Sequence, residues 1–277
     1  MEITTIIENV SNKNDLPAKY GLSLVVKTNG HTFLVDAGYD EQTLLNFHAL
    51  GFNLNDMEGM VISHNHNDHI GGLESFLKAD DNLKFYISSD CKTPLFTKKP
   101  FRRRKLVSCV DVIEKYEYRA VFVKDVYPLF ENVYLCQVKN PNPDYFCKDK
   151  KLRMIKDGKL IKDDFKHEIY VAVIENDKLK IISSCSHNGI INIIDDAEKK
   201  FNKKATAFVG GLHYKGKSKT KLNCKLDFLK DSIDKLNETN LKSLYTCHCT
   251  GKMAFEIIKD LGKAKTRYFS TGDIFTI

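Results

Sequence analysis

The sequence predicts an α+β protein built as a four-layer αββα sandwich, in which two packed mixed sheets carry helices on both outer faces. Two observations support this prediction. Each half of the chain runs from segments with strand character into segments with helical periodicity, the order that such a sandwich requires. The chain has 277 residues, 42% of them hydrophobic, which is enough to bury a sizeable core in a single domain spanning residues 1–277.

The first half opens with strands. Residues 3–9 suit a first strand, and the apolar runs at 22–26 and 31–35 are joined by Thr28-Asn29-Gly30, which predicts a β-hairpin. Residues 42–51 have helical periodicity, and Gly51 is well placed to end that helix. The next expected elements are a strand at 60–62, a helix beginning at Leu73 and a strand at 83–87.

Residues 88–130 have no clear period, because basic residues, prolines and aromatics are mixed there. We expect this segment to be an insertion or a lid packed over the scaffold. It contains the densest basic run, residues 98–105. We interpret that run as a solvated loop, with a phosphate-binding patch as the alternative.

The second half repeats the progression from strands to helices. A short hairpin is expected around Asp157-Gly158, and a longer one pairs residues 168–175 with 178–184 across Asn176-Asp177. The remaining expected elements are strands at 133–138, 205–209, 241–246 and 268–277, and helices at 190–201, 225–236 and 253–261.

Potential metal ligands are concentrated directly after the short strand at 60–62. His64, His66, Asp68 and His69 follow within a few positions. Imidazoles and carboxylates are ligands for zinc, iron and manganese. His64 and His66 point the same way if the backbone is extended, whereas Asp68 and His69 are adjacent and suit a second ion. The alternative is a polar surface loop, which seldom brings such a set to the end of an apolar strand.

Three more histidines end apolar strands: His187, His213 and His248. Strand ends that converge on one rim are typical of catalytic sites on rigid scaffolds. His187 could instead bond the backbone at a helix start, and His213 could either contact metal or substrate or support another ligand. Asp36, also at a strand end, could orient a ligand histidine through its second ring nitrogen, or simply form a turn.

The run His64-Asn65-His66-Asn67-Asp68-His69 resembles the H-x-H-x-D-H signature of the metallo-β-lactamase-fold hydrolases. Further motifs narrow the resemblance to the branch labelled dihydropterin ribofuranosyl-aminobenzene phosphate synthase-like, over residues 3–275. These motifs are Tyr20-Gly21-Leu22-Ser23-Leu24, Leu34-Val35-Asp36-Ala37-Gly38, Cys185-Ser186-His187-Asn188-Gly189-Ile190, Gly210-Gly211-Leu212-His213 and Cys247-His248-Cys249-Thr250-Gly251. The resemblance implies the αββα architecture and one or two divalent metal ions, with zinc expected first and iron or manganese as alternatives.

By this resemblance, His64 and His66 would hold one metal ion together with a third ligand from later in the chain. Asp68 and His69 would hold the other ion, and His248 would complete it. His187 would be a ligand or would contact the substrate directly.

The chain departs from the family pattern at two points. The usual middle motif, T-P-G-H, is missing, and counting back along the following strand puts Asp164 near its position, with His167 close by. The usual bridging Gly-Asp is replaced by Ser184-Cys185, so either Cys185 or His187 could take the bridging role.

These residues predict a hydrolase that uses metal-activated water on a small, anionic ester, lactone, thioester or phosphoester. Asp68 would hold the nucleophile as well as ligate, and His187 or His213 would donate to the developing anion. Three alternatives stay open: a pterin-related transferase or synthase, a nucleic-acid phosphodiesterase, and a metal-binding sensor without turnover.

The overall charge is mildly basic. There are 43 Lys and Arg against 36 Asp and Glu, a net charge of +7 that is spread along the chain. It suits an anionic small-molecule substrate without requiring nucleic acid. Eight scattered cysteines, the lack of a signal-like start and the lack of an 18-residue apolar run predict a cytoplasmic protein that does not enter the membrane.

Overall fold

The computed structural model describes residues 1–99, 104–146, 148–218 and 220–277. Most of the described strands belong to two large sheets. The first sheet has the order β18 (Ile274–Thr276), β1 (Glu2–Ile7), β2 (Ser23–Thr28), β3 (His31–Val35), β4 (Met60–Ile62), β5 (Phe85–Ser88) and β8 (Ala120–Val123). The second sheet has the order β17 (Lys265–Tyr268), β16 (Ser243–Thr246), β15 (Ala205–Gly210), β14 (Lys178–Ile182), β13 (Ile169–Glu175), β10 (Val133–Gln137) and β9 (Val126–Phe130).

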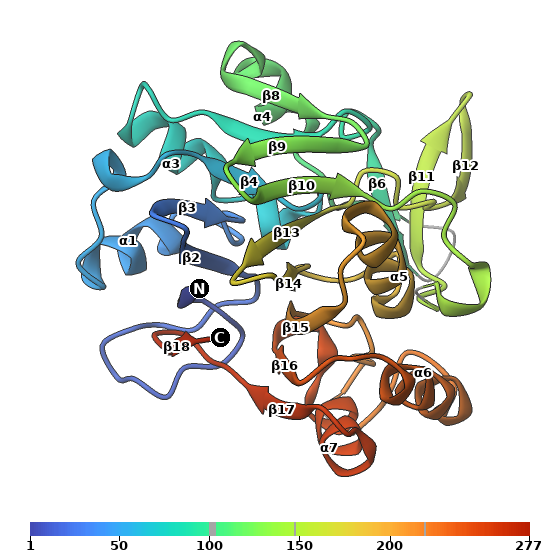
Figure 1. The fold of residues 1–277 in the computed structure, drawn as a ribbon. Coiled ribbons are helices and arrows are strands. Elements are labelled where there is room, and N and C mark those ends of the chain that lie inside the picture. Colours follow the sequence, from blue (N-terminus) through green and yellow to red (C-terminus); the bar gives the residue numbers. More distant parts are fainter. Residues whose placement is uncertain (100–103, 147, 219) are drawn as a thin grey trace.

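Helices cover the outer faces of both sheets (Figure 1). On the first sheet lie α1 (Gln42–Ala49), α3 (Leu73–Ala79) and α4 (Val110–Lys115), with the single turn α2 (Asn67–Ile70) beside them. On the second sheet lie α5 (Ile190–Phe201), α6 (Leu226–Glu238) and α7 (Lys252–Leu261). Short 3₁₀ turns are η1 (Leu54–Asp56), η2 (Glu117–Arg119), η3 (Pro143–Tyr145) and η4 (His248–Thr250).

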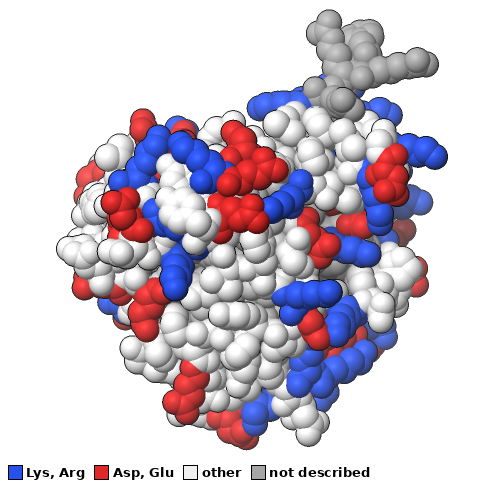
Figure 2. Space-filling model, turned by 90° about the horizontal axis from the view of Figure 1, so that it is seen from above, with Lys and Arg blue, Asp and Glu red and all other residues white. Residues whose placement is uncertain are grey.

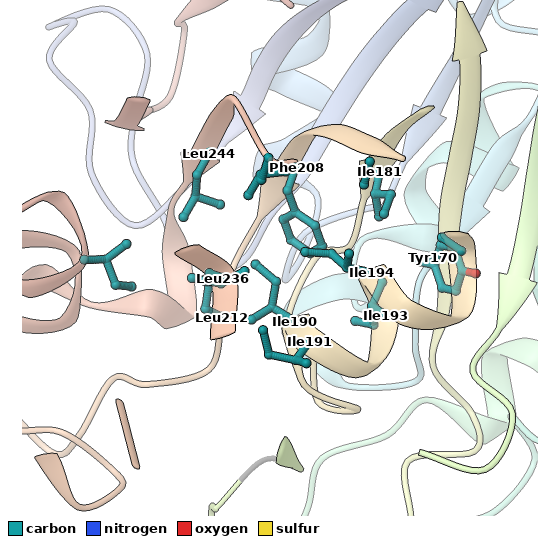
Figure 3. Close-up of a cluster of buried hydrophobic side chains, with 14 of the residues drawn as sticks. Tyr170, Ile181, Ile190, Ile191, Ile193, Ile194, Phe208, Leu212, Leu236 and Leu244 are labelled. Carbon is teal, nitrogen blue, oxygen red and sulfur yellow. The ribbon is translucent and has the colours of Figure 1, made fainter. Parts of the chain in front are cut away.

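Three hydrophobic cores separate these four layers, which confirms the predicted αββα sandwich. Strand β13 shows how one segment serves two of them, because side chains alternate across a sheet. Ile169, Val171 and Val173 belong to the core between the sheets, whereas Tyr170 and Ala172 face α5. Figure 3 shows the latter core, where Phe208 and Leu244 of the sheet meet Ile190, Ile193 and Ile194 of α5 and Leu236 of α6.

The hairpins predicted from turn residues are present. Thr28 pairs with His31 across Asn29 and Gly30, whose φ angles are 51° and 81°. Glu175 pairs with Lys178 across Asn176 and Asp177, with φ of 51° and 63°. Two consecutive residues with positive φ match the twist of the paired strands, and Asn, Asp and Gly tolerate that conformation. The shorter hairpin at Asp157-Gly158 has the same form.

Residues 88–130 differ from the expectation of one insertion. Strand β8 extends the first sheet and β9 the edge of the second. Among the described strands of this segment, β6 (Leu95–Lys98) and β7 (Arg104–Leu106) leave the sandwich. They join β11 (Leu152–Lys156) and β12 (Lys159–Lys162) in a small four-stranded sheet. The β11–β12 hairpin projects from the body of the molecule (Figure 1). Residues 100–103 of the basic run lie outside the described residues.

The last strands also begin earlier than expected, since β17 starts at Lys265 and runs parallel to β16.

Charge on the face shown in Figure 2 is mixed, with Lys and Arg interspersed with Asp and Glu around a broad uncharged area. Among the helices of the described residues, none has the length and apolar character needed to cross a membrane.

Candidate metal centre

The candidate site lies where parallel strands of both sheets end. Strands β3, β4, β5 and β8 run parallel in one sheet, as do β14, β15, β16 and β17 in the other. Crevices beyond the carboxyl ends of such strands are common binding sites. The loops after β4, β14, β15 and β16 carry His64, His187, His213 and His248, in that order.

The imidazole rings predicted from the sequence meet there. The ring centroids of His64 and His69 are 4.2 Å apart, and those of His69 and His248 are 5.0 Å apart. The ring centroid of His187 lies 4.8 Å from that of His64, 4.9 Å from that of His66 and 4.3 Å from that of His213. Five histidines of this set are buried, and His213 is half-buried at the mouth of the site.

Several strand ends carry a backbone conformation that non-glycine residues rarely adopt. The φ angles are 64° at Asp36, 53° at Ser186, 51° at His213 and 49° at His248. Such residues cost of order 1 kcal/mol each and cluster at functional sites. Here they turn the chain sharply after each strand, which aims the side chains into the site.

Asp36 sets the orientation of two histidines. Its carboxylate accepts hydrogen bonds from Nδ1 of His69 at 2.7 Å and from the backbone N–H and hydroxyl of Ser63 at 2.7 and 2.8 Å. Because the Ser63 hydroxyl donates to Asp36, its oxygen must accept the bond from Nδ1 of His64, 2.8 Å away. Both rings therefore turn Nε2 toward the site, and in the neutral His64 that nitrogen carries a free lone pair.

Asn9 does the same for His248. Its Oδ1 lies 3.0 Å from Nδ1 of His248, and its Nδ2 donates to the carbonyl oxygen of His248 at 3.1 Å. The backbone N–H of Gly21 also donates to Oδ1 of Asn9, which fixes that atom as the acceptor. Nδ1 of His248 must then carry the proton, and its Nε2 lone pair faces inward.

The inward-facing atoms form close contacts between hydrogen-bond acceptors. Nε2 of His248 lies 3.2 Å from Oδ2 of Asp68, and Nε2 of His64 lies 3.3 Å from Nε2 of His187. Two acceptors approach this closely only around a shared proton or a cation. In addition, Nε2 of His66 and Nδ1 of His187 are buried with no hydrogen-bond partner among the described residues. As metal ligands, these nitrogen and oxygen atoms fit one or two divalent metal ions.

Electrostatics favours the ligand forms of these groups. Burial lowers the pKa of His64 and of His187 well below the usual value, so both imidazoles are neutral. Burial raises the pKa of Asp68, but His69 and His248 outweigh it and hold that pKa below its usual range. For His69 burial is likewise outweighed, and Asp68 and Asp36 raise its pKa to about 9. A metal ion would replace the proton that His69 otherwise keeps.

A third group lies behind His66. Oδ2 of Asp163 is 3.7 Å from Nε2 of His66, and the Asp163 carboxylate also bonds Nε2 of His167 at 3.2 Å. Nδ1 of His167 accepts the backbone N–H of Asn65, so both ring nitrogens of His167 are occupied by hydrogen bonds. The potential metal ligands that remain in this group are His66 and Asp163. Asp164, the residue we expected here, instead accepts the backbone N–H of Lys166.

Two buried glutamates that the sequence reasoning missed hold the histidine loops in place. The Glu168 carboxylate accepts the backbone N–H groups of His187 and Asn188 at 2.7 and 2.8 Å. The Glu8 carboxylate accepts the backbone N–H of His248 at 2.6 Å and the hydroxyl of Tyr268 at 2.8 Å. Burial raises the pKa of both glutamates. Each glutamate is distant in sequence from the loop that it holds, so no local pattern reveals it.

A cavity of about 520 Å³ opens onto these ligands. His66, Asp68, Cys185 and His187 form part of its floor. Its rim is basic and aromatic, and part of it comes from the small sheet. The rim residues include Lys19, Tyr20, Tyr39, Lys99, Lys105, Asp149 and Lys151.

A sequence model of the metallo-β-lactamase superfamily matches residues 16–133, the segment that contains His64, His66, Asp68 and His69. The chain has the metallo-β-lactamase fold, and this segment is similar in sequence to that superfamily. Its fold agrees: a solved metal-dependent hydrolase of the β-lactamase superfamily superposes with a TM-score of 0.84 at 24% identity, covering 100% of this chain and 99% of that one.

Curated proteins that are similar to this chain carry different names. The 7,8-dihydropterin-6-methyl-4-(beta-D-ribofuranosyl)-aminobenzene-5'-phosphate synthase of Methanocaldococcus jannaschii is 26% identical over 265 residues, 91% of this chain and 88% of the relative. The Anti-Pycsar protein Apyc1 of Bacillus phage 010DV004 is 48% identical over 52 residues, 19% of this chain and 20% of the relative. The first of these agrees with the branch that the sequence motifs resemble.

Within this metallo-β-lactamase fold, the two departures from the family pattern have structural counterparts. Asp163 lies beside His66, where the chain lacks the usual middle histidine motif. Cys185 lies between the two groups of inward-facing histidines, where the pattern has its bridging aspartate. Asp164 was misplaced because residues 163–168 form a turn, with φ of 54° at Phe165, rather than the extended strand on which the count relied.

Proposed function

We propose that this protein is a metal-dependent hydrolase that uses metal-activated water on a small anionic ester, lactone, thioester or phosphoester. One observation carries the proposal: His64, His69, His187 and His248 converge around Cys185, and Cys185 and His187 line a cavity with a lysine-rich rim. A site that only binds metal has no need of such a cavity beside it. We propose two divalent ions, zinc first among the candidates.

The metal centre would supply a hydroxide at neutral pH and polarise the electrophile. The residues around it have separate tasks. Asp68 lines the cavity floor, where its carboxylate can accept the proton of the attacking water. His187 is held by stacking on Phe165, with ring centroids 4.6 Å apart and planes 6° apart. His213 also lines the cavity, with Nε2 3.6 Å from the Asp149 carboxylate, and its imidazole can donate to the developing anion.

The rim supports an anionic substrate. Lys99, Lys105 and Lys151 come from the small sheet and its connections, and Lys19 comes from the loop between β1 and β2. Their ammonium groups attract and position a negatively charged group next to the metal ligands. The cavity has room for a substrate of ordinary metabolite size.

The test is hydrolysis by the purified, zinc-loaded protein of a panel of esters, lactones, thioesters and phosphoesters. We expect turnover of at least one class, and we expect His66→Ala to abolish it and to lower the metal content. His48→Ala is the matched control, because His48 is exposed on α1 and its ring hydrogen-bonds only the carbonyl oxygen of Phe52 among the described residues. Full activity in the His66 variant would refute the scheme. Metal binding without consumption of any substrate would favour the sensor.

A pterin-related synthase is the second candidate, because the relative from Methanocaldococcus jannaschii that covers most of this chain carries that name. Condensation of a pterin with a ribosyl-aminobenzene phosphate, with no hydrolysis of the panel, would favour it. A nucleic-acid phosphodiesterase would instead show a steep salt dependence of binding.

We also propose a cytoplasmic setting. The structure describes seven of the eight cysteines, and all seven are free thiols. Thiols are retained in reducing compartments, and a buried thiol beside metal ligands is compatible with such a compartment.

A further inference from the structure

Cys185 occupies a position between the two halves of the metal centre. Its Sγ lies 3.1 Å from Nε2 of His69. It forms one group of potential ligand atoms with His64 and His187, and a second with His69 and His248, and within each group all atoms lie within 4.8 Å of one another. No other described residue belongs to both of these groups. We propose that the Cys185 thiolate is the ligand shared by two metal ions.

This inference rests on the metal centre of the proposed function, but it does not depend on hydrolysis. A thiolate sulfur has several lone pairs and can bind two cations at once. The competing candidate is His187, which we considered from the sequence. Nε2 of His187 faces His64, but His187 is absent from the group around His69 and His248. His187 is therefore placed to bind one ion only.

The chain around Cys185 holds the sulfur in position. Cys185 is 2% exposed. The preceding carbonyl, of Ser184, accepts the backbone N–H of Gly211 at 2.9 Å, and the following hydroxyl, of Ser186, donates to the carbonyl oxygen of Gly211 at 2.7 Å. Glu168 then holds the next two backbone N–H groups. This support on both sides leaves the thiol little freedom to turn away.

A second thiol provides a matched comparison. Cys249 also lines the cavity, and its Sγ accepts the backbone N–H of His213 at 3.3 Å. It shares a group of potential ligand atoms with Cys185 and His213, but with none of the four histidines that face one another. We therefore expect that Cys249 does not bind both metal ions and that Cys185 does.

A shared thiolate would make the metal centre chemically softer, in the sense of ligand preference, than a shared carboxylate would. Metal binding would convert the Cys185 thiol to a thiolate and release its proton to solvent. Sulfur ligands select zinc and similar metals over magnesium, calcium and manganese. The inference therefore also supports zinc among the proposed metals.

Cobalt(II) is a direct probe, because thiolate ligation produces a sulfur-to-cobalt charge-transfer band in the near ultraviolet. The metal-free full-length protein is loaded with Co²⁺ alone, without substrate. We expect the band in the wild type, its loss in Cys185→Ser, and its retention in Cys249→Ser and in Cys136→Ser, a buried thiol in the core beside α5. Cys185→Asp should keep two ions per chain by elemental analysis, but without the band.

X-ray absorption of the zinc-loaded wild type keeps the inference testable if a variant fails to fold. It should detect about one sulfur neighbour per zinc, near 2.3 Å. A wild type without the band, a Cys185→Ser variant that keeps it, or zinc without sulfur neighbours would overturn the inference. A protein with both sulfur signatures that hydrolyses nothing would keep this inference and remove the proposed function.

Discussion

Oδ2 of Asp36 accepts a hydrogen bond from Nδ1 of His69 at 2.7 Å, and both side chains are fully buried. The same oxygen accepts the hydroxyl of Ser63, which in turn accepts from His64. One carboxylate thus sets the ring orientation and the tautomer of two histidines that face the two halves of the site. Carboxylates that hold metal-binding histidines in this way are a large part of metal affinity.

Replacing Asp36 with Asn should therefore weaken metal binding roughly 10- to 100-fold. Asn tolerates the positive φ of Asp36, so the fold should be retained. The amide cannot accept three hydrogen bonds in the same geometry, and His69 loses the charge that favours its correct tautomer. Competition with a zinc chelator measures the change. Asp56→Asn, in the η1 turn on the surface, is the control and should bind zinc like the wild type.

Gly210 ends β15 beside the site, with φ of 134°. A Cβ atom there would lie 1.9 Å from the carbonyl oxygen of Ser183, on the neighbouring loop. Gly210→Ala should cost about 4 kcal/mol of the free energy of unfolding, or prevent folding, because backbone would have to move. Gly51 also has a positive φ, but nothing lies within 4 Å of its added Cβ. Gly51→Ala should cost only about 1 kcal/mol; equal losses in chemical denaturation would contradict the steric argument.

Glu175 joins the start of the chain to the β13–β14 hairpin. Its carboxylate lies 2.8 Å from the Met1 ammonium and also pairs with Lys180. Burial opposes the shift, but Lys180 and the Met1 ammonium lower the pKa of Glu175 from its usual 4.5 to about 2. A lowered pKa contributes stability that is complete above about pH 4.5 and is lost as the pH falls toward 2.

Glu175→Gln should therefore reduce the free energy of unfolding by about 1–2 kcal/mol at pH 7, allowing for partial exposure of the carboxylate. The difference between variant and wild type should shrink at pH 3. Urea unfolding at both pH values measures it. A difference that is the same at pH 7 and pH 3 would show that the ionised carboxylate contributes nothing.

Lys105 and Lys151 test the charge of the substrate. If either ammonium bonds an anionic group, its replacement by Ala should raise KM roughly tenfold with little change in kcat, because one charge-assisted hydrogen bond is lost. Steady-state kinetics on whichever panel substrate is turned over supplies the measurement. Lys178→Ala, at the exposed start of β14 and away from the cavity, should leave KM unchanged. Unchanged KM in both cavity variants would argue for a neutral substrate.

Local sequence patterns determined a large part of this protein. The hairpins at Asn29-Gly30 and Asn176-Asp177 follow from residues that accept positive φ, which is a property of each residue itself. The cluster from His64 to His69 was predictable for a similar reason, because a short strand and a tight helical turn bring neighbours in sequence into one small volume. The strand-end positions of His187 and His248 followed from apolar runs alone.

Only the tertiary structure decided which distant residues meet these elements. The pairing of β6 with β11 joins segments about 55 residues apart, so residues 88–130 could not be divided correctly between sandwich and small sheet from their own composition. Asp163 replaced Asp164 because a turn at Phe165 ends the strict alternation of side chains. Glu8, Glu168 and the central place of Cys185 depend on how two sheets pack. Periodicity and turn preference are encoded within a few residues, whereas packing is settled by the whole chain at once.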